Sequence, residues 1–180
     1  MHRPSAIDRR WSELVTRRRT SRLDATALAF NDTGRGLGRA AILGAVGLEL
    51  ARRRRWADLA GFALAEAGTP VGVNLVKLLV NRRRPREADI STFGTSFPSG
   101  HTAFAAATGV ALVLLCDEPG MRRVAWATAP VGTLGMAWSR TYLQLHWLTD
   151  VAAGGVLVTG VTLVAFDRVR RRGQAGGAHA

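Results

Sequence analysis

Cysteine is nearly absent from this chain of 180 residues, in which Cys116 is the only one. A lone cysteine excludes an intramolecular disulfide and a metal site built from several thiolates. Lysine is just as scarce, because Lys77 is the only one and arginine supplies the rest of the 25 basic residues. Residues 1–20 lack the apolar core that a cleavable signal peptide needs, so we expect no such peptide.

Negative charge is also in short supply, and this imbalance indicates the kind of partner. The chain has 13 acidic and 25 basic residues, which gives a formal net charge of +12 at pH 7. Such a chain suits phospholipid headgroups, phosphorylated substrates or nucleic acid. The arginines stand in short groups between apolar segments, without the basic face and exposed aromatic residues typical of nucleic-acid binding. We therefore expect no nucleic-acid partner.

Long hydrophobic runs are missing too. No segment reaches the about 18 uninterrupted apolar residues that identify a membrane helix without further argument. The chain is nevertheless 47% hydrophobic, and its frequent Gly, Ala and Thr residues are typical of helices that pack closely in lipid. A mean hydropathy of only +0.06 leaves a soluble helical bundle as the alternative. The expected apolar helices are residues 38–51, 56–80, 100–117, 124–139 and 151–167.

The predicted fold is all-α: an integral-membrane bundle of about five spanning helices, preceded by an N-terminal amphipathic helix at residues 22–33. We expect residues 1–21 to be a flexible basic arm and residues 22–172 to form a single bundle domain. The low-complexity residues 173–180 are expected to be a disordered tail.

The basic segments between the apolar helices predict a topology. If residues 52–55, 122–123 and 168–172 share the cytoplasmic side, the later helices alternate correctly across the membrane. Residues 81–99 and 139–150 then meet on the extracytoplasmic side. Arginines there run against the positive-inside rule, which indicates a functional reason for them.

The first polar cluster is KLLVNRRRP, which begins at Lys77. Lys77 and Arg84 are seven positions apart, so on a helix they project from nearly the same face. Pro85 disfavours a continuing helix, which leaves Arg84 at the helix end. Two cations on one face predict an anion site. The neighbouring arginines are interpreted as side chains next to the membrane that extend to its surface: Arg82, Arg83 and Arg86.

The second cluster is FPSGHTAF, which introduces an apolar helix. Ser99 is the predicted N-cap, and the following turn offers unpaired backbone N–H groups to a phosphate. Gly100 lets an anion approach the backbone closely, and His101 stands in the same turn. Taken alone, this stretch also fits an ordinary capped helix with a surface histidine.

The third cluster is SRTYLQLHWLTD, at residues 139–150. In a helix, His146 and Asp150 are close enough to pair, which would fix the imidazole tautomer and leave Nε2 as a nucleophile or base. Arg140 offers a planar fork that matches phosphate oxygens. The alternative is an interfacial His–Asp hydrogen bond within an aromatic belt, to which we assign Tyr142 and Trp147.

A metal site is a further possibility that the charge disfavours. His101, His146 and Asp150 are three possible ligands, but the cations beside them repel a divalent metal and attract an anion. We therefore expect no metal and no cofactor. The two remaining histidines lie near the termini and are interpreted as incidental: His2 and His179.

Together the three clusters match a known pattern: K-x6-RP from Lys77 to Pro85, PSGH from Pro98 to His101, and SR-x5-H-x3-D over residues 139–150. The chain resembles, over about residues 56–167, the type 2 phosphatidic acid phosphatase superfamily. That superfamily includes membrane lipid phosphatases, soluble bacterial acid phosphatases and vanadium haloperoxidases. Each motif is weak alone, whereas the ordered set of three is specific.

The resemblance implies a helical bundle and metal-independent phosphate ester hydrolysis. His146 corresponds to the nucleophile that forms a phosphohistidine, Asp150 to the residue that orients it, and His101 to the general acid. The implied phosphate-binding residues are Lys77, Arg84, Ser99, Gly100 and Arg140. Many membrane members have six spanning helices, whereas this sequence supports five.

The expected function is a plasma-membrane lipid phosphatase with its site on the extracytoplasmic side. Its partners would be the bilayer and a phosphorylated lipid, such as phosphatidic acid, phosphatidylglycerophosphate or a polyprenyl diphosphate. A lipid phosphotransferase, a catalytically silent lipid-binding protein and a soluble acid phosphatase are the alternatives. A haloperoxidase is disfavoured because those relatives are larger and soluble as a rule. The sequence leaves the lipid and the oligomeric state open.

Overall fold

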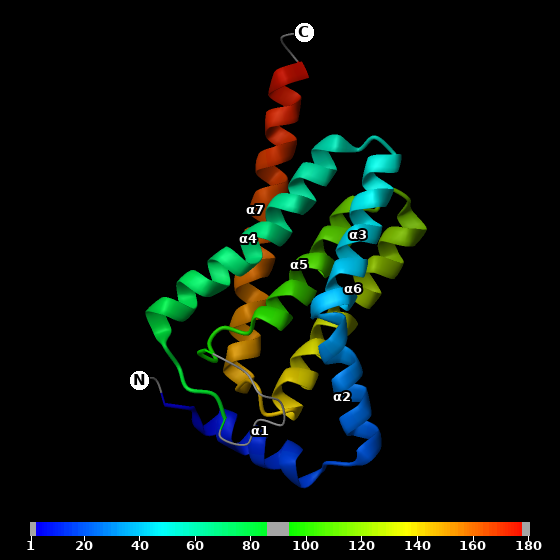
Figure 1. Cartoon of the computed structure of the whole chain (residues 1–180). Coiled ribbons are helices and arrows are strands. Elements are labelled where there is room, and N and C mark those ends of the chain that lie inside the picture. Colours follow the sequence, from blue (N-terminus) through cyan, green and yellow to red (C-terminus); the bar gives the residue numbers. More distant parts are fainter. Residues whose placement is uncertain (1–2, 86–93, 178–180) are drawn as a thin grey trace.

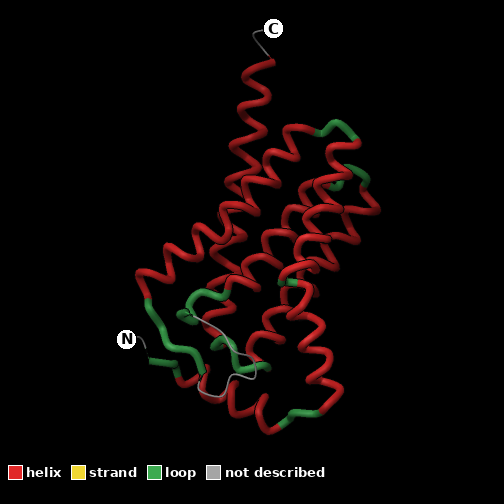
Figure 2. The backbone as a smooth tube through the Cα atoms, viewed as in Figure 1, coloured by secondary structure: helices red, strands yellow, loops and turns green. Residues whose placement is uncertain are grey.

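The computed structural model describes residues 3–85 and 94–177, which contain helices and loops but no strand (Figure 2). The described residues form the α-helices α1 (Ala6–Arg17), α2 (Ser21–Thr33), α3 (Gly36–Arg52), α4 (Trp56–Val80), α5 (Gly100–Leu115), α6 (Pro119–Tyr142) and α7 (Leu148–Gly177). The all-α class predicted from the sequence is confirmed.

Helix α5 is the centre of the bundle and packs against α4, α6 and α7 (Figure 1). Its small residues allow this, since Ala103, Ala107 and Ala111 are fully buried. At Gly109, an added Cβ would lie 3.0 Å from the Cβ of Ala129 in α6. Small side chains at such crossings let helix backbones approach closely, as in membrane bundles.

By length and composition, two helices among the described residues are suited to cross a membrane: Trp56–Val80 and Leu148–Val169. Helix α5 is apolar but shorter, with 16 residues. The number of spanning helices therefore stays a prediction. Both long helices expose large apolar side chains, among them Leu64, Val71, Leu75, Leu78 and Leu79 on α4 and Val156, Leu163 and Val164 on α7.

The loops gather at the two ends of the bundle as the charge pattern predicted. Arg55, at the α3–α4 junction, forms an ion pair of 2.7 Å with Asp117 at the α5–α6 junction. The C-terminal part of α7 extends beyond this same end, while the loops around residues 81–85 and 143–147 lie at the other (Figure 1). Which end faces the cytoplasm stays a prediction.

The N-terminal segment differs from the expected basic arm. Residues 6–17 form α1, which lies across the end of the bundle (Figure 1). Ser5 and Asp8 form a capping box that starts this helix, and Asp8 and Val15 are buried against the bundle. The predicted helix over residues 22–33 corresponds to α2.

At the C-terminus, α7 continues through residues 173–177, part of the segment expected to be a disordered tail. The remaining tail residues 178–180, with His179, lie outside the described residues, as do His2 and Arg86.

Candidate active site

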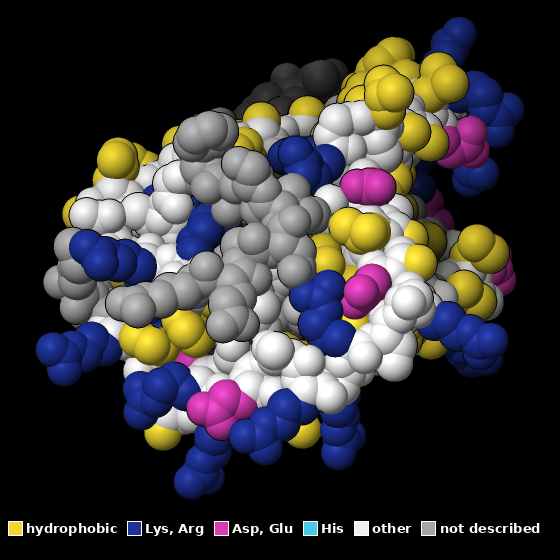
Figure 3. All heavy atoms as spheres, turned by 60° about the horizontal axis from the view of Figure 1, so that its bottom comes forward, with side chains coloured by type: hydrophobic (Ala, Val, Ile, Leu, Met, Phe, Trp, Pro, Cys, Tyr) yellow, Lys and Arg dark blue, Asp and Glu magenta, His cyan; other side chains and the backbone are white. Residues whose placement is uncertain are grey.

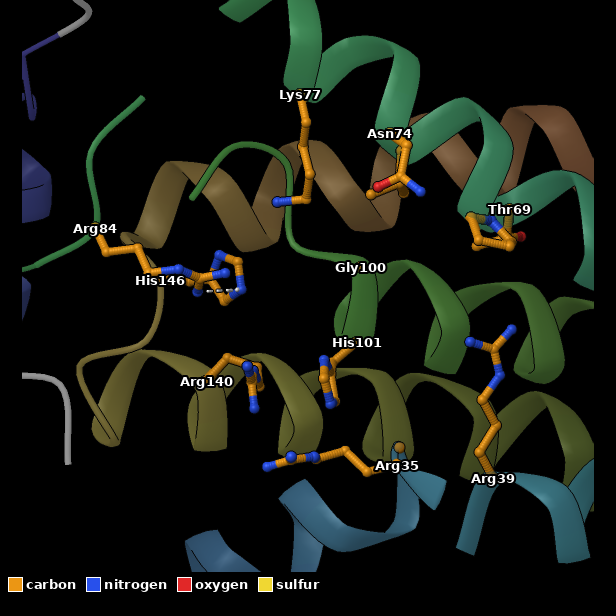
Figure 4. A pocket seen from close by; sticks show the side chains of 13 residues that line it. Arg35, Arg39, Thr69, Asn74, Lys77, Arg84, Gly100, His101, Arg140 and His146 are labelled. Atoms are coloured by element: carbon orange, nitrogen blue, oxygen red, sulfur yellow. Dashed lines mark hydrogen bonds between the residues drawn. The ribbon is translucent and has the colours of Figure 1, made fainter. Parts of the chain in front are cut away.

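A cavity of about 470 Å³ opens where α3, α4, α5 and α6 converge near the loop that carries His146 (Figure 4). Six of the eight predicted site residues line it: Lys77, Arg84, Gly100, His101, Arg140 and His146. Ser99 and Asp150 lie outside this lining. The other lining residues are Gly34, Arg35, Arg39, Thr69, Pro70, Val73 and Asn74.

The imidazole of His146 is held in one tautomer. Its Nδ1 lies 2.6 Å from the carbonyl oxygen of Ser96, which only accepts hydrogen bonds, so Nδ1 carries the proton. Nε2 therefore carries the lone pair, and it accepts a hydrogen bond of 3.3 Å from Arg84 Nη1 (Figure 4). Burial, together with the positive charges of Arg140 and Arg84, lowers the pKa of His146 to about 4. His146 is thus a neutral imidazole at neutral pH, and its unprotonated Nε2 faces Arg84 in the cavity.

Asp150 lies behind His146, with Oδ2 3.7 Å from Nδ1. The hydrogen bond expected between them is replaced by the bond to Ser96, because His146 precedes the first turn of α7 and the two residues are not on one continuous helix. Oδ2 of Asp150 instead accepts a hydrogen bond of 2.8 Å from the N–H of Trp147. Asp150 fixes the loop around His146 and places a negative charge behind its ring.

Arg82 differs most from its predicted position, because the sequence predicts an exposed side chain at the membrane surface and the structure buries it. It is only 5% exposed, and it forms ion pairs of 2.6 Å with Asp8 and 2.5 Å with Asp150. Burial opposes ionisation of Asp8, but hydrogen bonds from Thr149, Ser5 and Arg82 offset it and lower the Asp8 pKa to about 2. Arg82 thus connects α1 to the carboxylate behind His146. Nothing in the local sequence distinguishes it from its exposed neighbour Arg83.

Lys77 and Arg84 reach the cavity from different elements. Helix α4 ends at Val80, and Asn81 follows with a left-handed φ of 42°, so Arg84 belongs to the loop rather than to the helical face of Lys77. Lys77 Nζ donates to the carbonyl of Thr95 at 2.7 Å. Arg84 Nη1 donates to the carbonyl of Leu145 at 2.6 Å, which ties this loop to the loop of His146.

Helix α2 holds the end of α6, where Arg140 projects into the cavity. Arg140 is buried, and its Nη1 donates to the side-chain oxygen of Asn31. Tyr142, predicted as part of an interfacial aromatic belt, is instead buried at 2% exposure, and its hydroxyl donates to Asp24 at 2.8 Å. The sequence does not predict this role of Asn31, because one polar residue in an amphipathic helix has no distinguishing pattern.

The start of α5 forms the floor of the cavity. Ser99 is the N-cap as predicted, but its buried hydroxyl accepts from the N–H of Thr102 and does not line the cavity. Gly100 does line it, so the first turn of α5 brings backbone N–H groups to the position where a phosphate would bind. His101 projects beside it (Figure 4), and its buried Nε2 has no hydrogen-bond partner among the described residues.

Positive charge dominates the cavity. Its lining residues include five cationic side chains, of which the motifs predicted three, and no aspartate or glutamate: Arg35, Arg39, Lys77, Arg84 and Arg140. Such a lining attracts an anion and repels a divalent metal ion. Asp150, the one nearby carboxylate among the predicted site residues, is already engaged by Arg82.

The chain is similar to known proteins in sequence and in fold. Residues 58–174 match the family model of the PAP2 superfamily. One similar structure is a transmembrane PAP2-type phosphatidylglycerolphosphate phosphatase from Bacillus subtilis, with a TM-score of 0.79 and 22% identity over 93% of this chain and 85% of that one. Another is Aquifex aeolicus LpxE, with a TM-score of 0.74 and 20% identity over 91% of this chain and 96% of that one. No curated protein sequence matches the chain.

Proposed function

Since the chain belongs to the PAP2 superfamily, we propose that it is a membrane lipid phosphatase that works through a phosphohistidine on His146, without a metal ion. The observation that carries this proposal is the fixed tautomer of His146. Its Nδ1–H is bonded to Ser96, and its Nε2 faces a cavity lined by cations. A neutral imidazole with a directed lone pair beside an anion site is suited to attack phosphorus.

In the first step, the bound phosphate draws Arg84 Nη1 away from Nε2 of His146. Nε2 then attacks the phosphorus atom, and the bond from phosphorus to the lipid oxygen breaks. Lys77, Arg84 and Arg140 stabilise the charge on the phosphoryl oxygens, together with the backbone N–H at Gly100. His101, which becomes protonated when the negatively charged phosphate binds beside it, donates that proton to the leaving oxygen, so the lipid departs as an alcohol or as a phosphate. Asp150 and Ser96 stabilise the imidazole as it becomes positively charged.

In the second step, water attacks the phosphohistidine. His101, now neutral, takes a proton from the water, and the bond between Nε2 and phosphorus breaks to return the lone pair to His146. Inorganic phosphate leaves and the site returns to its starting state. Both steps use the same cations, so the protein needs no rearrangement between them.

A lipid is the proposed substrate because the surroundings of the site suit one. The long helices α4 and α7 expose apolar side chains along their length. At the end of the bundle where α1 lies, Lys and Arg side chains stand around the rim (Figure 3). This combination matches a membrane boundary, with acyl chains beside the helices and anionic headgroups at the rim. We propose that this end is the extracytoplasmic one, in the plasma membrane.

The test is phosphate release by the detergent-purified protein with excess chelator present. Phosphatidic acid, phosphatidylglycerophosphate and a polyprenyl diphosphate form the substrate panel, and His146→Ala is run in parallel. Chelator-resistant turnover that disappears in His146→Ala, with an unchanged melting temperature, is the expected result. No release from any lipid, or full activity in His146→Ala, contradicts the proposal.

A further inference from the structure

Helix α1 lies across the end of the bundle and contacts the segment that carries His146 (Figure 1). Near its start, Asp8 accepts hydrogen bonds from the N–H of Thr149 at 2.9 Å and from its hydroxyl at 3.0 Å. One turn later, the hydroxyl of Ser12 donates to the side-chain oxygen of Gln144 at 2.5 Å. No residue of α1 belongs to the three sequence motifs, yet the helix binds the chain on both sides of His146.

Asp8 also belongs to a buried cluster of three charges. Asp8 is 1% exposed and Asp150 is fully buried. The guanidinium of Arg82 lies between them, 2.6 Å from the carboxylate of Asp8 and 2.5 Å from that of Asp150. The pKa of Asp8 is lowered to about 2, because its hydrogen bonds outweigh the cost of burial, so Asp8 is ionised at neutral pH. Two carboxylates and one guanidinium leave the cluster with one net negative charge.

This negative charge lies behind the imidazole of His146, since Oδ2 of Asp150 is 3.7 Å from Nδ1. Without Asp8, the remaining ion pair would be neutral. The cations of the cavity lining stand on the other side of the ring, and they disfavour the positive charge that the imidazole gains when it is phosphorylated. In a buried site, where charges are screened weakly, a net negative charge behind the ring offsets that effect.

The backbone of Arg82 connects α1 to the bond that fixes the tautomer. The carbonyl of Arg82 accepts a hydrogen bond of 2.8 Å from the N–H of Ser96. The carbonyl of Ser96 in turn accepts the proton of His146 Nδ1. The residue that Asp8 holds therefore supports the imidazole twice, through its side chain and through its main chain.

From these observations we infer that Asp8 is a positioning residue for the nucleophile. It holds Arg82 against Asp150 and leaves the cluster with the net negative charge that stabilises the phosphorylated imidazole. The inference rests on the proposed function, because it takes His146 as the nucleophile. Helix α1 is then part of the catalytic machinery, although it lies outside the three motifs.

Asp8→Asn tests this role, because it removes the charge and keeps nearly the same side-chain size. We expect kcat to fall about tenfold with little change in KM, since the charge acts on the phosphorylated imidazole rather than on the bound lipid. Asp8→Ser removes the same charge with a smaller side chain and is measured in parallel. Glu13→Gln is the matched control, because it removes a negative charge from an exposed position of the same helix. An unchanged kcat in both Asp8 variants overturns the inference.

A double variant separates the charge of Asp8 from its contacts. Asp8→Asn combined with Arg82→Gln removes one charge of each sign, so the cluster regains its net negative charge although it loses further contacts. We expect kcat of the double variant to be at least about threefold higher than that of Asp8→Asn alone. If kcat is not higher, Asp8 serves only to attach α1, and the inference is overturned.

A binding measurement needs no turnover, so it separates this inference from the proposed function. Orthovanadate can bond to an imidazole nitrogen and leave the ring positively charged, whereas sulfate binds only through the cations. In Asp8→Asn, we expect the vanadate concentration needed to raise the melting temperature to increase about tenfold, and the sulfate concentration to stay the same. A selective loss of vanadate protection supports the inference even if no lipid is hydrolysed. Equal changes for the two anions, or none, overturn it even if lipids are hydrolysed.

Discussion

At the scale of single residues, His146 and its carbonyl partner decide what chemistry is available. Ser96 offers a backbone oxygen rather than a carboxylate, so the contact to Nδ1 fixes the tautomer without adding a formal charge. The charge comes from Asp150, one step further away at 3.7 Å. This arrangement keeps Nε2 unprotonated in the resting protein and still provides a counter-charge when the imidazole is phosphorylated.

The lowered pKa of His146 predicts the acid limb of the pH profile. Its folded-state pKa is about 4, against 6.5 for a free imidazole, so the imidazole of His146 stays unprotonated well below pH 6.5. We therefore expect no loss of the rate of phosphoenzyme formation from protonation of His146 between pH 7 and about pH 5, measured as kcat/KM. An acid limb centred near 6.5 and assigned to His146 would contradict this.

The same shift has a consequence for stability. Between pH 6.5 and about 4, His146 binds a proton in the unfolded chain but not in the folded one. Its contribution therefore makes the protein less stable as the pH falls through this range. His146→Ala should show a smaller loss of melting temperature than the parent over the same interval.

Arg82 predicts a stability effect that its exposed neighbour should not share. Arg82→Gln leaves Asp8 and Asp150 buried without their cation, and we expect a loss of about 3–5 kcal/mol in the free energy of unfolding, with a fall in kcat. Arg83→Gln changes an exposed side chain and should stay within about 0.5 kcal/mol of the parent. Denaturation in detergent measures both. The account is contradicted if the two variants behave alike.

At the scale of elements, the crossing of α5 and α7 sets the position of the site. The N–H of Ser99, at the start of α5, donates to the carbonyl of Asp150 in the first turn of α7 at 3.0 Å. Gly154, one turn later in α7, packs against Ser99 so closely that no side chain fits there. An added Cβ would lie 2.5 Å from the carbonyl oxygen of Ser99. The backbone of the PSGH turn rests directly on α7, which holds His101 and the loop of His146 in a fixed relation.

Gly154→Ala tests this crossing. The added methyl group must push Ser99 away, so we expect a loss of about 1–3 kcal/mol in stability and at least about a tenfold fall in kcat. Gly160 is the control on the same helix, because nothing lies within 4 Å of an added Cβ there. Gly160→Ala should be neutral or slightly stabilising. Equal effects at the two glycines would show that the crossing does not position the site.

The sequence predicts the site residues that lie in the three motifs. It does not predict the residues that hold those side chains in position. Lys77, His101 and Arg140 each belong to a motif that resembles those of the superfamily, so the pattern identifies them. Asp8 and Asn31 act on residues more than 70 and 100 positions away, and no local signal encodes such a contact. The S-x-x-D pattern at Ser5 does predict the start of a helix, but not what that helix covers.

At the scale of the whole molecule, the bundle combines an apolar surface with a polar, cationic site at one end. The exposed apolar side chains of α4 and α7 have no covering element among the described residues. In water such surfaces drive aggregation, whereas in a bilayer they face lipid. A lipid phosphatase needs this arrangement, because the reacting phosphate must reach the cations while its chains stay in the membrane.

Membrane insertion can be tested by extraction. We expect the protein to stay in the membrane fraction after alkaline carbonate treatment and to require detergent for release, because its α4 and α7 faces are buried in lipid. A basic protein bound only through anionic headgroups would be released by high salt or carbonate. Release without detergent would contradict membrane insertion and favour a soluble acid phosphatase.

The covalent phosphohistidine proposed on His146 can be tested by the stereochemical course of the reaction at phosphorus. A phosphatidic acid analogue with an isotopically chiral thiophosphate is hydrolysed, and the configuration of the released thiophosphate is determined. Two successive in-line displacements, first by His146 and then by water, predict net retention. Net inversion would mean that water attacks the substrate directly, and it would contradict the account whatever lipid the protein prefers.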